Sequence, residues 1–80
     1  MTPPKIGSFY QHYKGGFYVV TDNAVDTETQ AAVVVYRSIR YGTTWTRPLT
    51  VWCAMVDLPA MGACITVPRF KEVEVPYDRH

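Results

Sequence analysis

The sequence predicts a small all-β domain, a compact SH3-like β-barrel or roll of about five strands with one short helical turn. Turn-forming residues recur at short intervals, and the runs between them are rich in β-branched and aromatic residues. The composition of the 80 residues, 48% hydrophobic and 19% charged, is that of a folded domain with a thin core. We expect one domain over residues 7–75, with a disordered N-terminus at 1–6 and a frayed C-terminus at 76–80.

The first predicted element is a β-hairpin. Residues 9–14 and 17–21 both have strand character, and Gly15 and Gly16 between them can adopt the positive φ angles that a two-residue hairpin turn requires. Residues 22–30 are polar, which predicts a solvated loop.

The segment 31–37 is the strongest strand of the chain. Three consecutive valines, Val33 to Val35, disfavour helix and indicate burial on both faces, so we expect this strand to be the central one. Residues 43–47 resume extended character, and Pro48 ends that strand because proline cannot donate a ladder hydrogen bond.

The next segment is ambiguous. Leu49, Trp52, Cys53 and Val56 have the i, i+3, i+4, i+7 spacing of a short helix, but the run is apolar throughout and a strand remains the alternative. Residues 57–63 are predicted as a loop, and residues 64–75 as one or two closing strands bent at Pro68. The expected core is Phe9, Val19, Val34, Trp52, Ile65 and Phe70.

Charge and cysteine content exclude several classes of protein. Eight Lys and Arg against seven Asp and Glu give a net charge of +1, too small for bulk attraction to a polyanion. We find neither a signal peptide nor a membrane span, so we expect a cytoplasmic protein with no membrane partner. Cys53 and Cys64 lack metal-site spacing. We predict that both are reduced and near the core, with a disulfide as the alternative, and we predict neither a metal nor a cofactor.

The densest group of polar and aromatic residues lies at 10–14. On a strand, Tyr10, His12 and Lys14 share one face. Arg37 ends the strongest strand, and Trp45 and Arg47 precede Pro48, where a guanidinium can stack on an indole or pair with an anion. The predicted ligand-binding residues form a basic and aromatic rim: Tyr10, His12, Lys14, Arg37, Trp45 and Arg47.

Such a rim suits an anionic or planar group, and the candidate partners are a nucleotide, a nucleic acid or an anionic peptide. A non-enzymatic binding module is the first hypothesis, and no catalytic residue is assigned. A nucleotide-related enzyme, with His12 as acid–base and Lys14 as electrophilic stabiliser, is the second. A hydrogen-bonded structural seam with no ligand is the third.

Residues 7–18 (Gly-Ser-Phe-Tyr-Gln-His-Tyr-Lys-Gly-Gly-Phe-Tyr), with Val-Tyr-Arg at 35–37 and Trp-Thr-Arg-Pro at 45–48, resemble the domain-of-unknown-function 1653 family of bacteria and phages. The resemblance covers about residues 7–72. It implies a small domain, found alone or appended to other proteins such as Nudix-type hydrolases, with a ligand-handling or interaction role. Gln11 and Ala54 depart from the pattern, where the family often has Arg and Glu.

Overall fold

The computed structural model describes residues 2–75 and is built almost entirely of β-strands. The elements are β1 (Phe9–His12), β2 (Phe17–Val25), β3 (Ala32–Ser38), β4 (Thr44–Pro48), α1 (Leu49–Trp52), β5 (Met55–Ala60), β6 (Ala63–Pro68) and β7 (Phe70–Val73). The prediction of a mostly β chain with one short helix is confirmed.

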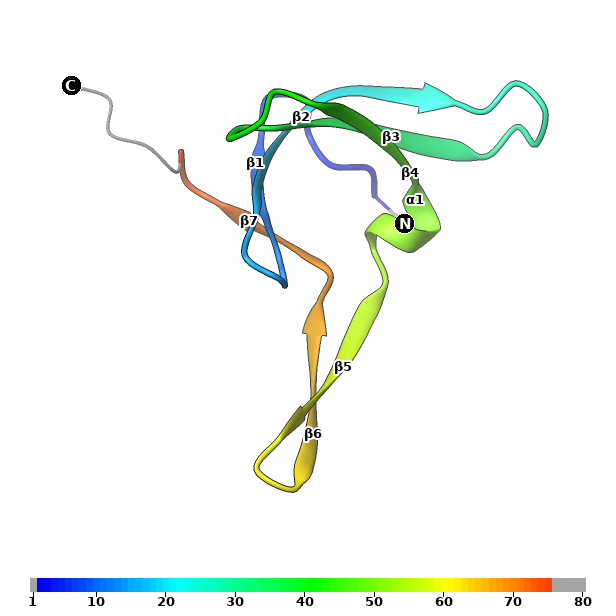
Figure 1. Ribbon diagram of the computed structural model, residues 1–80. Coiled ribbons are helices and arrows are strands. Elements are labelled where there is room, and N and C mark those ends of the chain that lie inside the picture. Colours follow the sequence, from blue (N-terminus) through cyan, green and yellow to red (C-terminus); the bar gives the residue numbers. More distant parts are fainter. Residues whose placement is uncertain (1, 76–80) are drawn as a thin grey trace.

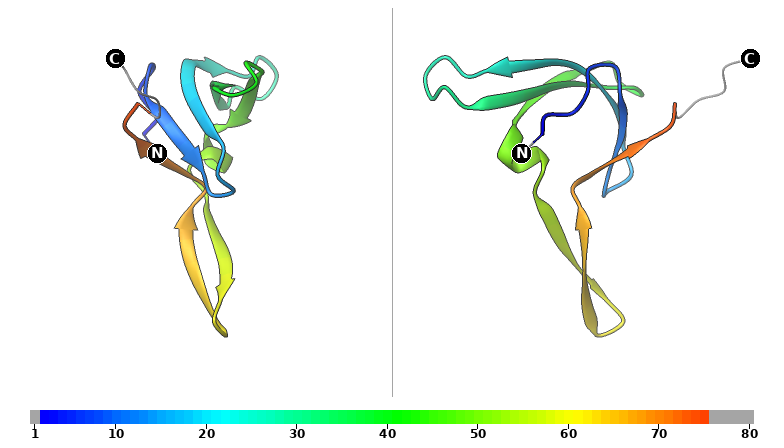
Figure 2. Two further views of the ribbon diagram at one scale, coloured as in Figure 1. Left: turned by 60° about the vertical axis from the view of Figure 1, so that its left-hand side comes forward. Right: turned by 180° about the vertical axis from the view of Figure 1, so that it is seen from behind.

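The strands form two antiparallel sheets. Five of them pair in the order β4-β3-β2-β1-β7, and β5 and β6 form a separate two-stranded sheet. Figure 1 shows the five-stranded sheet bent around α1, and both Figure 1 and Figure 2 show the β5–β6 hairpin projecting from it. No ladder joins the edge strands β4 and β7 within residues 2–75, so this sheet is open rather than a closed barrel.

The β1–β2 hairpin is present, but its turn is longer than predicted. The amide of Gly15 donates to the carbonyl of His12 at 2.7 Å, and the amide of His12 donates to the carbonyl of Gly16 at 2.8 Å. Only Gly15 of the two glycines has a positive φ, at +110°. The chain therefore turns over residues 13–16, because Tyr13 and Lys14 also belong to the turn.

The prediction of a loop at residues 22–30 is wrong at its start. β2 continues to Val25, because its pairing with β3 resumes after a register shift between Val20 and Asp22. The true loop lies after Val25, where the Asp26 carboxylate accepts the amides of Glu28 and Thr29 at 2.9 and 3.1 Å. Polar residues in the second half of β2 gave that half the composition of a loop.

The central strand was also assigned wrongly. β2 occupies the middle of the five-stranded order, and β3 lies between β2 and β4. Of the three consecutive valines in β3, only Val34 is fully buried, while Val33 and Val35 are half-buried. An unbroken apolar run therefore marks a well-covered strand here, but not the middle one.

The predicted short helix within 49–56 is confirmed as α1 over Leu49–Trp52, whereas Met55 and Val56 already belong to β5. The predicted loop at 57–63 is wrong. Met61 and Gly62 have φ angles of 52° and 81°, the positive values of a tight two-residue hairpin turn that joins β5 to β6. The predicted break at Pro68 is confirmed, since β6 ends there and β7 begins at Phe70.

The register defines two faces of the five-stranded sheet, because residues directly opposite in a ladder point to the same side. The inner face, which packs on α1, carries Tyr10, His12, Tyr18, Val20, Val34, Tyr36 and Phe70. The outer face carries Phe9, Gln11, Val19, Arg37 and Lys71.

The core lies on the inner face. It comprises Val20, Val34, Tyr36, Leu49, Trp52 and Phe70. Val34, Trp52 and Phe70 were predicted correctly. Phe9 and Val19 are wrong because their register puts them on the outer face, and Ile65 is wrong because it lies on the projecting hairpin, 50% exposed.

Two further sequence predictions concern cysteines and termini. Cys53 and Cys64 are free thiols as predicted, but both are exposed rather than near the core.

At the N-terminal end Pro4 is buried, and its carbonyl accepts a hydrogen bond from Asn23 Nδ2 at 3.0 Å. The predicted frayed segment 76–80 lies outside the described residues, and the boundaries at 7 and 75 stay predictions. No helix of residues 2–75 is long and apolar enough to cross a membrane.

Candidate functional site

The structure distributes the predicted rim residues over different surfaces. Tyr10 and His12 lie on the inner face, and the pairing of Val34 with Arg47 and of Tyr36 with Trp45 places both β4 residues on that face too. Lys14 lies in the turn that follows His12. Arg37 lies on the outer face, where it borders a hollow with Phe9 and Val19, and is not brought to the others.

His12 and Arg47 approach the same aromatic ring from different strands. The His12 imidazole packs edge-on against Phe70, with ring centroids 4.9 Å apart. The Arg47 guanidinium carbon lies 5.5 Å from the centroid of the same ring. Phe70 in turn stacks on Trp52, with centroids 3.8 Å apart and ring planes within 8°. The two polar groups thus meet at a rigid aromatic surface.

Tyr36 fixes the orientation of Arg47. The Nε–H of Arg47 donates to the phenol oxygen of Tyr36 at 3.1 Å, and Tyr36 itself is only 4% exposed. This contact uses one of the five N–H donors of the guanidinium. The terminal nitrogens of Arg47 form no hydrogen bond with any residue of 2–75, so they remain available to an anion.

The environment of His12 is positively charged. Burial lowers the pKa of His12 below its ordinary 6.5, and the charges of Arg47, Arg69 and Lys14 lower that pKa further. Every charge that acts on His12 among the described residues is therefore a cation. Three cations close to one imidazole make this part of the surface electropositive.

The hydrogen bond that His12 accepts indicates which ring nitrogen carries the proton in the neutral imidazole. The backbone amide of Lys14 donates to His12 Nδ1 at 3.2 Å, so we assign the proton of the neutral ring to Nε2. His12 then presents an N–H donor even when it is uncharged. Such a donor can bind an oxygen of a phosphate, carboxylate or carbonyl group.

Arg69 belongs to this cluster and was missed from the sequence. Its amide donates to the carbonyl of Ala54 at 3.1 Å, and its carbonyl accepts from the amide of Tyr13 at 2.9 Å, which fixes the backbone at the bend between β6 and β7. Its side-chain Nε is buried without a hydrogen-bond partner among residues 2–75. The sequence feature that could have indicated Arg69 is its position directly after Pro68, where the chain bends back to the sheet.

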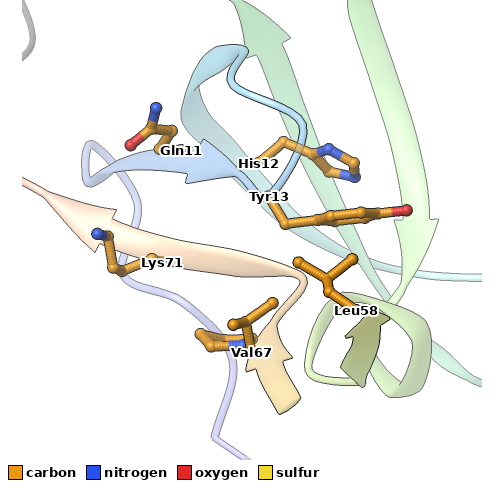
Figure 3. Close-up of a pocket in the computed structure, with 7 residues that line it drawn as sticks. Gln11, His12, Tyr13, Leu58, Val67 and Lys71 are labelled. Carbon is orange, nitrogen blue, oxygen red and sulfur yellow. The ribbon is translucent and has the colours of Figure 1, made fainter. Parts of the chain in front are cut away.

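A pocket of about 270 Å³ lies beside this cluster, and Figure 3 shows its lining. The Tyr13 ring lies between His12 and Leu58 in that view, and its centroid is 4.5 Å from the His12 ring. Val67 and Pro68 of β6 form the apolar floor, and Gln11 and Lys71 border it from the outer side. The pocket therefore combines an apolar floor with polar groups on its margin.

Tyr10 and Lys14 border other hollows. Tyr10 lines a pocket between the N-terminal segment and Trp52, where burial raises the pKa of the Tyr10 phenol and the nearby Glu72 and Cys53 raise it further. Lys14 lines a pocket between the two turns that follow β1 and β3. The cluster consists of His12 and Arg47, which both approach Phe70, and of Arg69, which like Lys14 acts on His12 by charge. Residues 2–75 contain no group of three metal-ligating side chains.

Comparisons with known proteins agree with this fold. The sequence model of the DUF1653 family, described as a protein of unknown function, matches residues 8–72. A crystal structure of a protein belonging to DUF1653 from Bordetella bronchiseptica is 35% identical in sequence and superposes with a TM-score of 0.73, covering 94% of this chain and 95% of that chain. No curated protein matches the chain.

Proposed function

We propose a binding function for this chain, which belongs to the DUF1653 family of proteins of unknown function. The protein is a non-enzymatic binding module that receives the phosphate of a nucleotide-sized ligand at the cluster of His12, Arg47 and Arg69. One observation carries the proposal: the charges that act on His12 are all cations, and the Nε of Arg69 is a buried donor without a partner in residues 2–75.

The donors of the cluster suit an oxyanion. Arg47 offers its terminal nitrogens, Arg69 its unpartnered Nε, and His12 its Nε2–H. Hydrogen bonds from charged donors to a phosphate or carboxylate are shorter and about twice as strong as those between neutral groups. The Phe70 ring beside His12 and Arg47 reduces their contact with water, which strengthens these interactions further.

A planar group next to the anion would find an aromatic partner. Trp45 lies two residues before Arg47 on the inner face and is 53% exposed. Stacking of a base on such a ring contributes about 1–3 kcal/mol. The net charge of +1 provides little attraction to a long polyanion, so we favour a single nucleotide over an extended nucleic acid.

The test is a titration followed by the backbone amide signals of the ¹⁵N-labelled protein. AMP is the probe, and single-stranded DNA and a polyglutamate peptide are run in parallel. We expect AMP to shift the amides of His12, Arg47 and Phe70. Arg47→Gln and Arg69→Gln should each weaken binding about tenfold, the effect of losing one charge-assisted hydrogen bond.

Arg40→Gln is the matched control. It removes the same charge from an exposed arginine whose guanidinium carbon lies 5.2 Å from the centroid of its neighbour Tyr41. This variant should bind AMP within about twofold of the wild type, since Arg40 lies over Tyr41 rather than at the Phe70 ring and an exposed charge is screened. Absence of any shift with all three probes, or equal weakening by Arg40→Gln and Arg47→Gln, would leave the cluster as a structural seam.

Two finer proposals accompany the binding function. The five strands bent around α1 support a relation to SH3-like rolls, with the gap between β4 and β7 left open. A cytoplasmic location is supported by Cys53 and Cys64, because exposed free thiols persist in a reducing compartment.

A further inference from the structure

A pocket of about 590 Å³ lies between the turn that joins β1 to β2 and the turn that joins β3 to β4. It is lined by residues 14–18 and 38–41, and we call it the inter-turn pocket. Its volume lies within the range of about 300–1,000 Å³ that is usual for small-molecule sites. None of His12, Arg47 and Arg69 lines it, so the inter-turn pocket is separate from the cluster to which we assign phosphate binding.

Exposed apolar side chains gather at the inter-turn pocket. Tyr41 is 74% exposed, Phe17 38% and Ile39 36%, although burial of large apolar side chains is favourable. Single exposed apolar side chains are normal on a protein surface, whereas several that line one hollow indicate a binding surface. The half-buried ring of Tyr18 adds a further aromatic wall. The pocket can therefore bind an apolar ring.

The walls of the inter-turn pocket are held in place by the fold. The Ile39 amide donates to the Phe17 carbonyl at 3.1 Å, which joins the two turns directly. Gly16 leaves room for the Tyr18 ring, because a Cβ at Gly16 would come within 3.0 Å of the Tyr18 phenol oxygen. A ligand thus finds walls that are already positioned, which reduces the entropic cost of binding.

Both charged side chains of the inter-turn pocket are cations. Lys14 comes from the first turn and Arg40 from the second, and no Asp or Glu lines the pocket. The Lys14 ammonium lies 5.8 Å from the centroid of the Tyr13 ring, and the Arg40 guanidinium carbon lies 5.2 Å from that of the Tyr41 ring. Neither cation forms a hydrogen bond or an ion pair through its side chain within residues 2–75. Their N–H donors are therefore available to an anion.

We propose that the inter-turn pocket is a second binding site, which takes a small aromatic carboxylate. The ring of the ligand packs against Phe17, Tyr18 and Tyr41. Its carboxylate accepts hydrogen bonds from the planar guanidinium of Arg40, whose geometry matches a carboxylate, and from the Lys14 ammonium. Most of the lining is apolar, so a compact ring with one charge suits it better than a sugar phosphate, whose hydroxyl groups would lose water without gaining partners.

The test is a titration of the ¹⁵N-labelled protein with 3-phenylpropionate. We expect the amide signals of Phe17, Ile39 and Tyr41 to shift, with a dissociation constant of about 1 mM or lower. The uncharged 3-phenylpropionamide keeps the ring and lacks the charge, and propionate keeps the charge and lacks the ring. Each should bind about tenfold more weakly or worse, because each loses one of the two recognised groups.

Two arginine variants separate contact from general charge. Arg40→Gln should weaken 3-phenylpropionate binding about tenfold, the effect of losing a charge-assisted hydrogen bond. Arg37→Gln is the matched control, because it removes the same charge from an exposed arginine that lies on the outer face and does not line the pocket. It should change the affinity by less than about twofold. The dispersion of the amide spectrum confirms that both variants are folded.

Three results would overturn the proposal: no shift with 3-phenylpropionate up to about 10 mM, equal binding of the uncharged amide, or equal weakening by Arg37→Gln and Arg40→Gln. AMP and 3-phenylpropionate report on different sites. A failure of this second site therefore leaves the AMP test of the cluster unaffected, and the reverse also holds.

Discussion

The hydrogen bond from Arg47 Nε to the Tyr36 phenol can be measured by a double-mutant cycle. Tyr36→Phe removes only the acceptor oxygen, and Arg47→Met removes the donors while keeping an unbranched side chain. The bond is 3.1 Å long and Tyr36 is 4% exposed, so Tyr36→Phe removes a buried acceptor from Arg47 Nε.

The expected magnitude follows from burial and charge. A buried hydrogen bond with one charged partner contributes about 1.5–3 kcal/mol, and the half-exposed position of Arg47 reduces this value. We expect each single variant to lose about 1–2 kcal/mol of unfolding free energy, which corresponds to a melting temperature lower by about 4–16 °C. The coupling energy between the two changes should be about 1 kcal/mol.

The assay is urea unfolding of the wild type, both single variants and the double variant, followed by circular dichroism. Arg40→Met is the control, since the guanidinium of Arg40 lies over the exposed Tyr41 ring and takes no part in the bond between Arg47 and Tyr36. Should the effects of Tyr36→Phe and Arg47→Met add within about 0.3 kcal/mol, Tyr36 does not hold Arg47. The orientation that we assign to the guanidinium would then be wrong.

Three further predictions concern single residues. The lowered pKa of His12 means that the unfolded chain binds its proton more tightly, so unfolding free energy should fall as pH drops below about 6.5 and level off below the native pKa. His12→Gln should remove this dependence, and a native pKa of 6.5 or above by proton NMR would contradict it. Gly15→Ala should cost about 1 kcal/mol or more because φ is +110° there, and an unchanged melting temperature would argue against that turn geometry. Val34→Ala should cost about 2 kcal/mol and half-buried Val33→Ala clearly less by urea unfolding, whereas equal losses would contradict the assigned faces of β3.

The sequence predicted element types better than it predicted strand ends and faces. The hairpin at β1–β2, the strand β3 and the bend at Pro68 all follow from local residue preferences. The second half of β2 does not, because Asp22 and Asn23 are polar yet held in a ladder by β3. The β5–β6 turn was missed because Met61 at a φ of 52° is a rare choice for that conformation.

The candidate site was predicted from the alternation of side chains between the two faces of a strand. Alternation tells which residues share a face within one strand, but not which strands lie side by side. Tyr10 and His12 share a face as predicted, because they lie two residues apart on β1. Arg37 was chosen over Tyr36, although Tyr36 and not Arg37 shares the buried side of Val34. Which strands lie next to Arg47 is a property of the sheet order, and no local pattern encodes it.

The stacked rings of Trp52 and Phe70 have a consequence for how this fold can vary. They come from either side of the β5–β6 hairpin, and the Arg69 amide bonded to the Ala54 carbonyl joins the same two points of the chain. Residues 55–68 therefore form an inserted hairpin, and the contacts of residues 52 and 54 with residues 70 and 69 hold its two ends together. Such a segment can be lengthened, trimmed or exchanged for another sequence while the aromatic core beneath it keeps its arrangement.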